Sequence, residues 1–205
     1  MIAIIDYGVG NLFSLKSSFA AIGAETVVTG DPAVIQRADK LVLPGVGAFG
    51  DAAERLRRGG LDKLICEEAE GGKPLLGICL GMQLLFDYSL EYGRHDGLGL
   101  IPGSVRPIAD YIPAGYKIPH IGWNALWFPA GKPASPLFRF IKEGDCVYFV
   151  HSFCGAECED SVIAASEYGG LLTAAVARDN VYGVQFHPEK SGDVGLNILR
   201  AFCGS

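Results

Sequence analysis

Cys79 lies at the centre of the sequence Gly77-Ile78-Cys79-Leu80-Gly81, between an apolar run that predicts a strand and a segment that predicts a helix. This pattern is typical of a nucleophile elbow, a sharp turn that exposes a reactive side chain above a sheet. The start of a helix favours a thiolate, because the free N–H groups and the helix dipole stabilise negative charge. We expect the N–H of Leu80 to face a developing oxyanion. Alone, the pattern fits a buried structural cysteine equally well.

The sequence His187-Pro188-Glu189 follows a second predicted strand, residues 181–186, and offers a base and an acid. Side chains two residues apart in extended chain point the same way, so Glu189 can orient His187 and stabilise its charged form. Pro188 stiffens the spacer between them. With Cys79 as nucleophile, these residues predict covalent acyl transfer at the carboxyl ends of sheet strands.

The three remaining histidines are weaker candidates for the base. His95 lies in a polar, glycine-rich stretch, whereas His120 and His151 have no carboxylate at the spacing of His187 and Glu189. We predict that His120 and His151 are structural residues or lie beside the substrate.

The other five cysteines are not expected to take part in the chemistry. Cys66 and Cys203 lie on apolar helical stripes and are predicted to be small core residues, and Cys146 lies beside a strand. Cys154 and Cys158 form a pair with three residues between them, but no second pair of ligands is nearby, which disfavours zinc. We therefore expect no metal, and no cofactor is predicted.

The elements that must position these residues alternate in the first half of the chain. Apolar strands are predicted at residues 2–6, 26–28, 41–43 and 74–78. Helices are predicted at residues 12–22, 61–70 and 81–88, with a short helix that begins at residue 32 and another that follows residue 50. Uniformly apolar strands alternating with helices predict an α/β fold: an open, mostly parallel sheet with helices on both faces.

The second half of the chain has a different pattern. Proline is frequent in residues 101–136, which predicts hairpins and loops. Short strands are predicted at 147–150, 162–165, 172–176 and 182–186, and a final helix from about residue 191. Because no linker or repeat interrupts the chain, we expect residues 1–205 to form one domain.

The bulk composition excludes several functional classes. Hydrophobic residues make up 49% of the chain and charged residues 20%, which suits a globular protein with a core. The net charge of −6 is spread without long runs, which argues against a nucleic-acid-binding surface. The apolar run 2–5 is too short for a signal peptide or a membrane span. We expect a cytoplasmic protein with reduced thiols.

Gly45-x-Gly47-x-x-Gly50 formally fits the dinucleotide fingerprint and follows a predicted strand. That fingerprint requires an acid at the end of the next strand, where this chain has Cys79. Pro44 also fixes the chain just before the loop, and the lysine of a P-loop is absent. A dinucleotide-binding domain therefore remains only as an alternative.

The blocks around the candidate nucleophile and base resemble the class I (triad) glutamine amidotransferases. They are Gly77-Ile-Cys-Leu-Gly-Met-Gln83 and Gln185-Phe-His-Pro-Glu189. Further blocks resemble the glutaminase subunits of imidazole glycerol phosphate synthase: Asp6-Tyr-Gly-Val-Gly-Asn11, Leu43-Pro-Gly-Val-Gly-Ala-Phe49, His120-Ile-Gly-Trp-Asn124, Tyr148-Phe-Val-His-Ser152 and His187-Pro-Glu-Lys-Ser191. The resemblance covers nearly the whole chain. Local departures are Phe153, where many relatives carry tyrosine, and the cysteines at 154 and 158.

This resemblance implies a flavodoxin-like fold and hydrolysis of glutamine through a thioester on Cys79. It implies that the N–H of Val46 or Gly47 supplies the second oxyanion donor, and that Gln83 helps to hold the substrate. A solvated helix residue is the alternative for Gln83. The resemblance also assigns the backbone around His151, Ser152 and Phe153 to the amino-acid end of glutamine.

The resemblance also implies a heterodimer with a (β/α)8 cyclase, which uses the ammonia to make imidazole glycerol phosphate and an aminoimidazole carboxamide ribotide. Asn11, Trp123 and Lys190 match blocks near that interface. Their alternatives are a helix N-cap, a core aromatic and a solvated charge. Another acceptor, as in the synthesis of pyridoxal phosphate, anthranilate or GMP, stays open.

Overall fold

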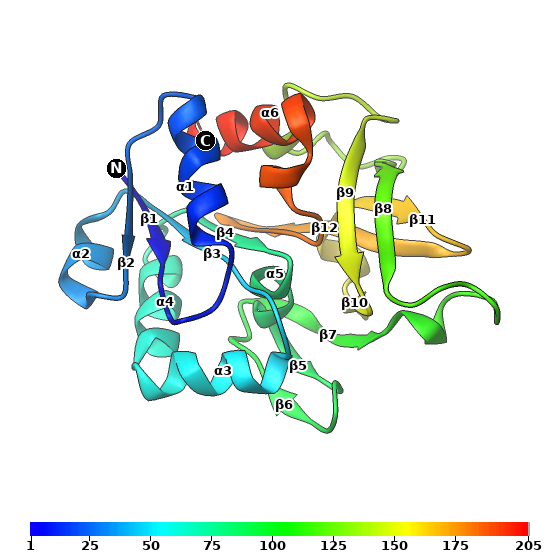
Figure 1. The fold of residues 1–205 in the computed structure, drawn as a ribbon, viewed down its shortest axis with the longest axis horizontal. Coiled ribbons are helices and arrows are strands. Elements are labelled where there is room, and N and C mark those ends of the chain that lie inside the picture. Colours follow the sequence, from blue (N-terminus) through cyan, green and yellow to red (C-terminus); the bar gives the residue numbers. More distant parts are fainter. Residues whose placement is uncertain (205) are drawn as a thin grey trace.

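Runs of apolar residues form a central seven-stranded sheet in the computed structural model, which describes residues 1–204. Its strand order is β11-β12-β13-β4-β3-β1-β2 (Figure 1). The strands are β1 (Ile2–Ile5), β2 (Thr26–Thr29), β3 (Lys40–Leu43), β4 (Leu75–Ile78), β11 (Val162–Glu167), β12 (Leu171–Arg178) and β13 (Val181–Val184). The adjacent strands β2, β1, β3, β4 and β13 pair in parallel. β12 pairs antiparallel with both β13 and β11.

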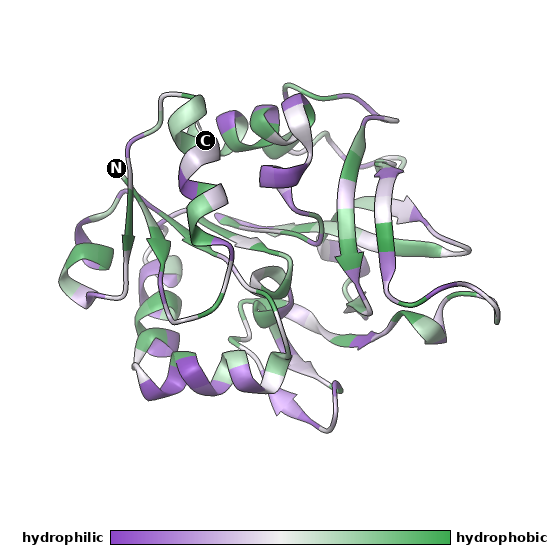
Figure 2. Cartoon of the chain, in the orientation of Figure 1, coloured by the Kyte–Doolittle hydropathy of each residue, from purple (hydrophilic) through white to green (hydrophobic). Residues whose placement is uncertain are grey.

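Helices cover both faces of this sheet, which explains why its inner strands are apolar throughout. Ile2 and Ile4 of β1 pack with one set of helices, whereas Ala3 and Ile5 pack with the other. The first set is α1 (Leu12–Ala21) and α6 (Gly192–Cys203); the second is α2 (Pro32–Arg37), α3 (Phe49–Arg58) and α4 (Leu61–Glu70). Figure 2 shows hydrophobic residues along the central strands and hydrophilic residues along much of α3.

Two smaller sheets complete the molecule. A four-stranded sheet has the order β10-β7-β5-β6, and a hairpin pairs β8 with β9. Their bounds are β5 (Phe86–Ser89), β6 (His95–Asp96), β7 (Ile101–Pro107), β8 (His120–Ala125), β9 (Cys146–His151) and β10 (Phe153–Ala156). Short 3₁₀ helices span Ile108–Asp110, Pro136–Phe138, Glu159–Ser161 and Pro188–Lys190. None of the helices in residues 1–204 is both long and apolar enough to cross a bilayer.

The predicted α/β fold, with a mostly parallel sheet and helices on both faces, is confirmed. One helix prediction is wrong in its second half: α5 spans only Leu80–Leu84, and the chain continues as β5 instead of remaining helical to residue 88. The carbonyls after α5 pair with distant amides, since Leu85 O accepts from Ile101 N and Phe86 O accepts from Gly99 N. Long-range pairing therefore overrides the local helical pattern.

Candidate active site

Cys79 sits in a strained turn between β4 and α5. Its backbone has φ 54° and ψ −112°, a conformation that is unfavourable for a residue with a side chain. A Cβ at Gly77 would lie 2.6 Å from the Gly81 carbonyl oxygen, and one at Gly81 would collide with the Leu43 carbonyl. The turn is tied to β13, because the Cys79 N–H donates to the Val184 carbonyl at 2.8 Å. Both flanking glycines are therefore required by close backbone packing.

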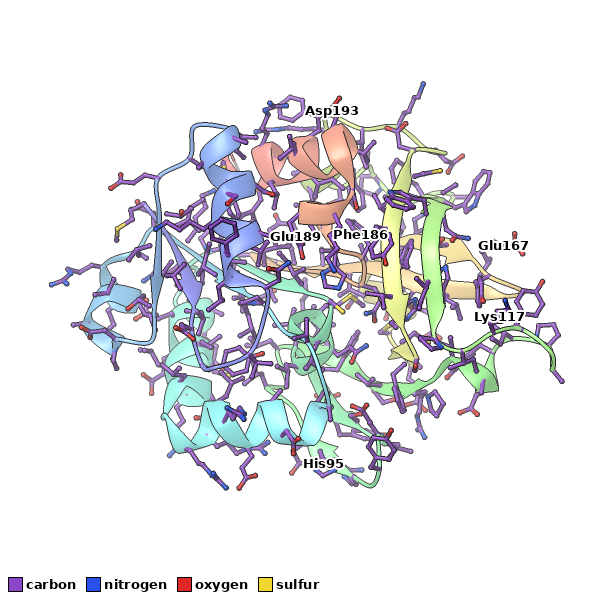
Figure 3. All side chains as sticks on the ribbon, in the orientation of Figure 1. His95, Lys117, Glu167, Phe186, Glu189 and Asp193 are labelled. Carbon is purple, nitrogen blue, oxygen red and sulfur yellow. The ribbon has the colours of Figure 1, made fainter. Side chains whose placement is uncertain are left out.

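His187 and Glu189 meet behind Cys79. His187 follows β13, and its Nδ1 lies 2.8 Å from Glu189 Oε1. The side chain of His187 is only 4% exposed, and that of Glu189 only 1%. Glu189 belongs to the segment between β13 and α6 and lies near the middle of Figure 3. The two side chains meet because the 3₁₀ helix Pro188–Lys190 turns the chain, not because the chain stays extended as the spacing suggested.

The charge state of His187 depends on its two partners. Burial by itself disfavours the imidazolium, but hydrogen bonds to Cys79 and Glu189, together with the negative charges of these groups, raise the pKa of His187 to about 9. The imidazole is therefore protonated at neutral pH. One unpaired atom remains behind it, since Glu189 Oε2 is buried and has no hydrogen-bond partner among the described residues.

A cavity of about 380 Å³ opens in front of Cys79, which is large enough for a small amino acid. Most of the predicted site residues line it: Val46, Gly47, Cys79, Leu80, Gln83, His151, Ser152, Phe153, His187 and Lys190. Three further lining residues were not predicted: Glu91, Pro119 and Val150. Glu189 does not line this cavity, and its carboxylate contacts the site through its hydrogen bond to His187 Nδ1.

The segment that carries Val46 and Gly47 is held at both of its ends. At one end, the buried hydroxyl of Tyr7 donates to the Pro44 carbonyl at 2.7 Å. At the other, the Phe49 N–H donates to a carboxylate oxygen of Glu91 at 2.6 Å, which caps α3. Neither contact was predicted, because both partners are far away in the sequence. Together they keep this segment against the elbow.

Gln83 is buried on α5, so the alternative of a solvated helix residue is wrong. Its side-chain Nε2 donates to the Phe153 carbonyl at 3.1 Å and to Gln185 Oε1 at 3.0 Å. Both of its N–H bonds are therefore used within the protein. Its carbonyl oxygen is the atom available to a ligand in the cavity.

His120 and His151 form a pair, with His120 Nδ1 lying 3.0 Å from His151 Nε2. Burial lowers the pKa of both histidines and brings that of His151 to about 4. His151 Nδ1 donates to the Phe153 carbonyl at 2.8 Å, which fixes the wall of the cavity. The pair links β8 to β9. The third histidine, His95, lies outside this pair and packs against Gly50.

The three residues predicted at a partner interface have different environments. Asn11 caps α1, its Oδ1 accepting from Ser14 N at 3.4 Å. Trp123 is 63% exposed, so the alternative of a core aromatic is wrong, and it packs edge-on against Tyr148. The ammonium of exposed Lys190 lies 5.6 Å from the ring centre of Tyr148. Trp123 and Lys190 are therefore brought together at Tyr148.

The remaining cysteines, apart from exposed Cys146, have environments that do not favour reaction. Burial raises the pKa of Cys154 to about 12 and that of Cys158 to about 11, so both are thiols at neutral pH. Cys66 and Cys203 are half-buried instead of lying fully in the core, and Cys146 is exposed. No group of metal-ligating side chains that could hold an ion occurs in residues 1–204.

Comparison with known proteins assigns the family. The protein-family model described as "Glutamine amidotransferase class-I" matches residues 3–203. A solved glutamine amidotransferase superposes with a TM-score of 0.75 at 18% identity, covering 99% of this chain and all 100% of its own. PurLQS from Thermotoga maritima superposes with a TM-score of 0.74 at 19% identity, covering 99% and 97%. These two likenesses show the fold, and the family match shows that the chain belongs to the class I glutamine amidotransferases.

Closer relatives narrow the assignment. The chain is 47% identical to imidazole glycerol phosphate synthase subunit HisH of Wolinella succinogenes, covering 99% of this chain and 98% of the relative. It is 51% identical to HisH of Syntrophotalea carbinolica, covering 98% of each. Within the class I family the chain therefore belongs to the HisH glutaminase subunits of imidazole glycerol phosphate synthase. This membership replaces the alternatives of another acceptor and of a dinucleotide-binding domain.

Proposed function

We propose that the chain performs its glutaminase reaction by covalent catalysis, with Cys79 as nucleophile, His187 as proton carrier and Glu189 as orienting acid. The observation that carries this proposal is the position of His187, which lines the same cavity as Cys79 and whose Nδ1 lies 2.8 Å from Glu189 Oε1. A protonated imidazole beside the sulfur favours the thiolate, and Glu189 holds the ring in the tautomer that presents Nε2 to the sulfur.

The reaction then runs in two steps. The Cys79 thiolate attacks the carboxamide carbon of glutamine, and the N–H groups of Leu80 and of the Val46–Gly47 segment stabilise the oxyanion. His187 gives its proton to the nitrogen, ammonia leaves, and a γ-glutamyl thioester remains. Neutral His187 next takes a proton from water, which attacks the thioester and releases glutamate and the thiolate.

The cavity offers groups that complement the amino-acid end of glutamine. The carboxylate of Glu91 supplies negative charge for the α-ammonium group. The backbone around His151, Ser152 and Phe153 lines the same cavity, and we assign it to the amino-acid end of glutamine. The carbonyl oxygen of Gln83 accepts a hydrogen bond from the substrate, because both of its N–H bonds are already used.

We further propose that the partner is a (β/α)8 cyclase in a heterodimer, and that Asn11, Trp123 and Lys190 lie at the interface. Ammonia needs an acceptor, and the relatives are named as subunits of a synthase. Large apolar side chains are exposed on the same elements, since Phe13 on α1 is 82% exposed and Ile121 on β8 is 57% exposed. Exposed apolar groups of this size favour a protein contact.

The test is glutamine hydrolysis by the chain alone, by the chain with the candidate cyclase, and by the complex with a cyclase ligand. Gly45 and Gly47 flank Val46 and allow the Val46 N–H to turn away from the oxyanion. Losing one such donor costs about 10²–10³ in rate, so we expect activation of that size in the complex. Equal rates in all three samples would contradict a partner-dependent site.

A further inference from the structure

The side chain of Gln185 is completely buried, and the mechanism above gives it no task. It lies just after β13, where its backbone N–H donates to the Ala174 carbonyl at 2.8 Å. Its side-chain Nε2 points at the nucleophile, 3.8 Å from Cys79 Sγ. A fully buried amide must find partners for its polar atoms within the protein, so the identity of each partner is informative.

The orientation of this amide is fixed by a main-chain carbonyl. The Phe153 carbonyl can only accept, so the Gln83 side chain must turn its NH₂ group toward it. The second N–H of that group then donates to Gln185, which must present its oxygen. A reversed Gln185 amide would set two NH₂ groups against each other. The NH₂ group of Gln185 therefore faces the sulfur of Cys79.

We propose that Gln185 is a further catalytic residue, whose side-chain N–H donates a hydrogen bond to the Cys79 sulfur and stabilises the thiolate. A thiol sulfur is a weak acceptor, whereas a thiolate is a charged one, so the donor favours the ionised form. The inference rests on Cys79 being the nucleophile, as proposed above.

This second donor has a role that His187 cannot fill throughout the cycle. His187 gives up its proton when ammonia leaves, and it stays neutral until it takes a proton from the attacking water. Gln185 keeps its N–H at every stage. It therefore faces the sulfur while His187 is neutral, and it stabilises the departing thiolate together with the reprotonated His187 at the end of the second step.

Two substitutions separate this role from packing. Gln185→Glu keeps an oxygen for the N–H of Gln83 but removes the donor to the sulfur, whereas Gln185→Met removes both contacts. Ser166→Ala is the control, because Ser166 is equally buried and bonds the Ala125 carbonyl away from the cysteine. All are made in the full chain, and thermal unfolding checks that each one folds.

The measurement is the rate of alkylation of Cys79 by iodoacetamide as a function of pH. Peptide mass spectrometry follows Cys79 itself, because Cys146 is exposed and also reacts. We expect the midpoint of the profile to rise by about one pH unit in Gln185→Met, a tenfold loss of reactive cysteine at neutral pH, and by more in Gln185→Glu. The rate at the alkaline plateau and the Ser166→Ala profile should stay as in the parent.

Unchanged midpoints in folded variants would overturn the proposal, and so would the failure of both variants to fold, since Gln185 would then serve the fold alone. The role of Cys79 is judged separately, from the parent chain in complex with the cyclase. If alkylation of Cys79 there leaves glutamine hydrolysis intact, the proposed mechanism fails whatever Gln185 does.

Discussion

Replacing Glu189 by glutamine removes a buried negative charge and keeps the size of the side chain. Glu189 Oε1 accepts a 2.8 Å hydrogen bond from His187 Nδ1, and the side chain is 1% exposed, so solvent cannot replace this bond. Hydrogen bonds to charged groups contribute about 1.5–3 kcal/mol, which corresponds to a loss of roughly 10- to 150-fold in kcat/KM.

The unpaired Oε2 position makes a larger loss possible. No neighbour there fixes which end of the new amide faces His187. If the NH₂ group faces Nδ1, it forces the proton onto the wrong nitrogen, and a comparable change in a serine protease triad costs about 10⁴. We therefore expect Glu189→Gln to lose between about 10- and 10⁴-fold, and His187→Asn to lose more.

The assay is the pH dependence of kcat/KM for glutamine in the cyclase complex. Because the Glu189 carboxylate helps to raise the pKa of His187 to about 9, although burial opposes it, the variant should show a lower pKa for this group. Glu167→Gln, at the exposed end of β11 (Figure 3), is the matched control. Activity within twofold of the parent and an unchanged profile would refute the reasoning.

Three further predictions concern stability and the oxyanion segment. Gly81→Ala should unfold the chain or cost more than about 3 kcal/mol, because the new Cβ collides with the Leu43 carbonyl; thermal unfolding measures this. Tyr7→Phe should cost about 1 kcal/mol of unfolding free energy and lower kcat, because it frees the Pro44 carbonyl; steady-state kinetics and denaturant unfolding test it. The pKa of His187 rises from 6.5 to about 9 on folding, so its stabilising contribution is complete below pH 6.5 and is lost as the pH rises through 9. His187→Asn should abolish this part of the pH dependence of unfolding, and an identical dependence in the variant would contradict it.

The fold was largely predictable because its strands are short apolar runs between helix caps and glycine turns. Asp31 and Pro32 begin α2 as local chemistry predicts, with Asp31 accepting from Ala33 N at 2.9 Å. The error at α5 and β5 has a clear origin. The residues after Leu84 have no local signal for ending the helix, and the partners of the new strand, β6 and β7, lie later in the chain, outside the span that a helical pattern reads.

The candidate site was predictable where residues lie in motifs and not where they meet through the fold. Cys79, His187 and Glu189 come from two short blocks that carry the chemistry in their spacing. Glu91 lies outside these blocks, and Tyr7 lies in a block whose residues indicate no chemistry. Only folding brings the two residues to the segment 44–49. A sequence cannot reveal such contacts without the topology of the sheet.

The most direct test of the central claim compares two nitrogen sources in the complex of Cys79→Ala with the cyclase. The variant removes the sulfur and leaves the partner's chain intact, so we expect synthesis with glutamine to be abolished and synthesis with added ammonium to match the parent complex. Cys146→Ala, at the exposed start of β9, should leave both reactions unchanged. Normal glutamine-dependent synthesis by the Cys79→Ala complex would contradict covalent catalysis at this cysteine.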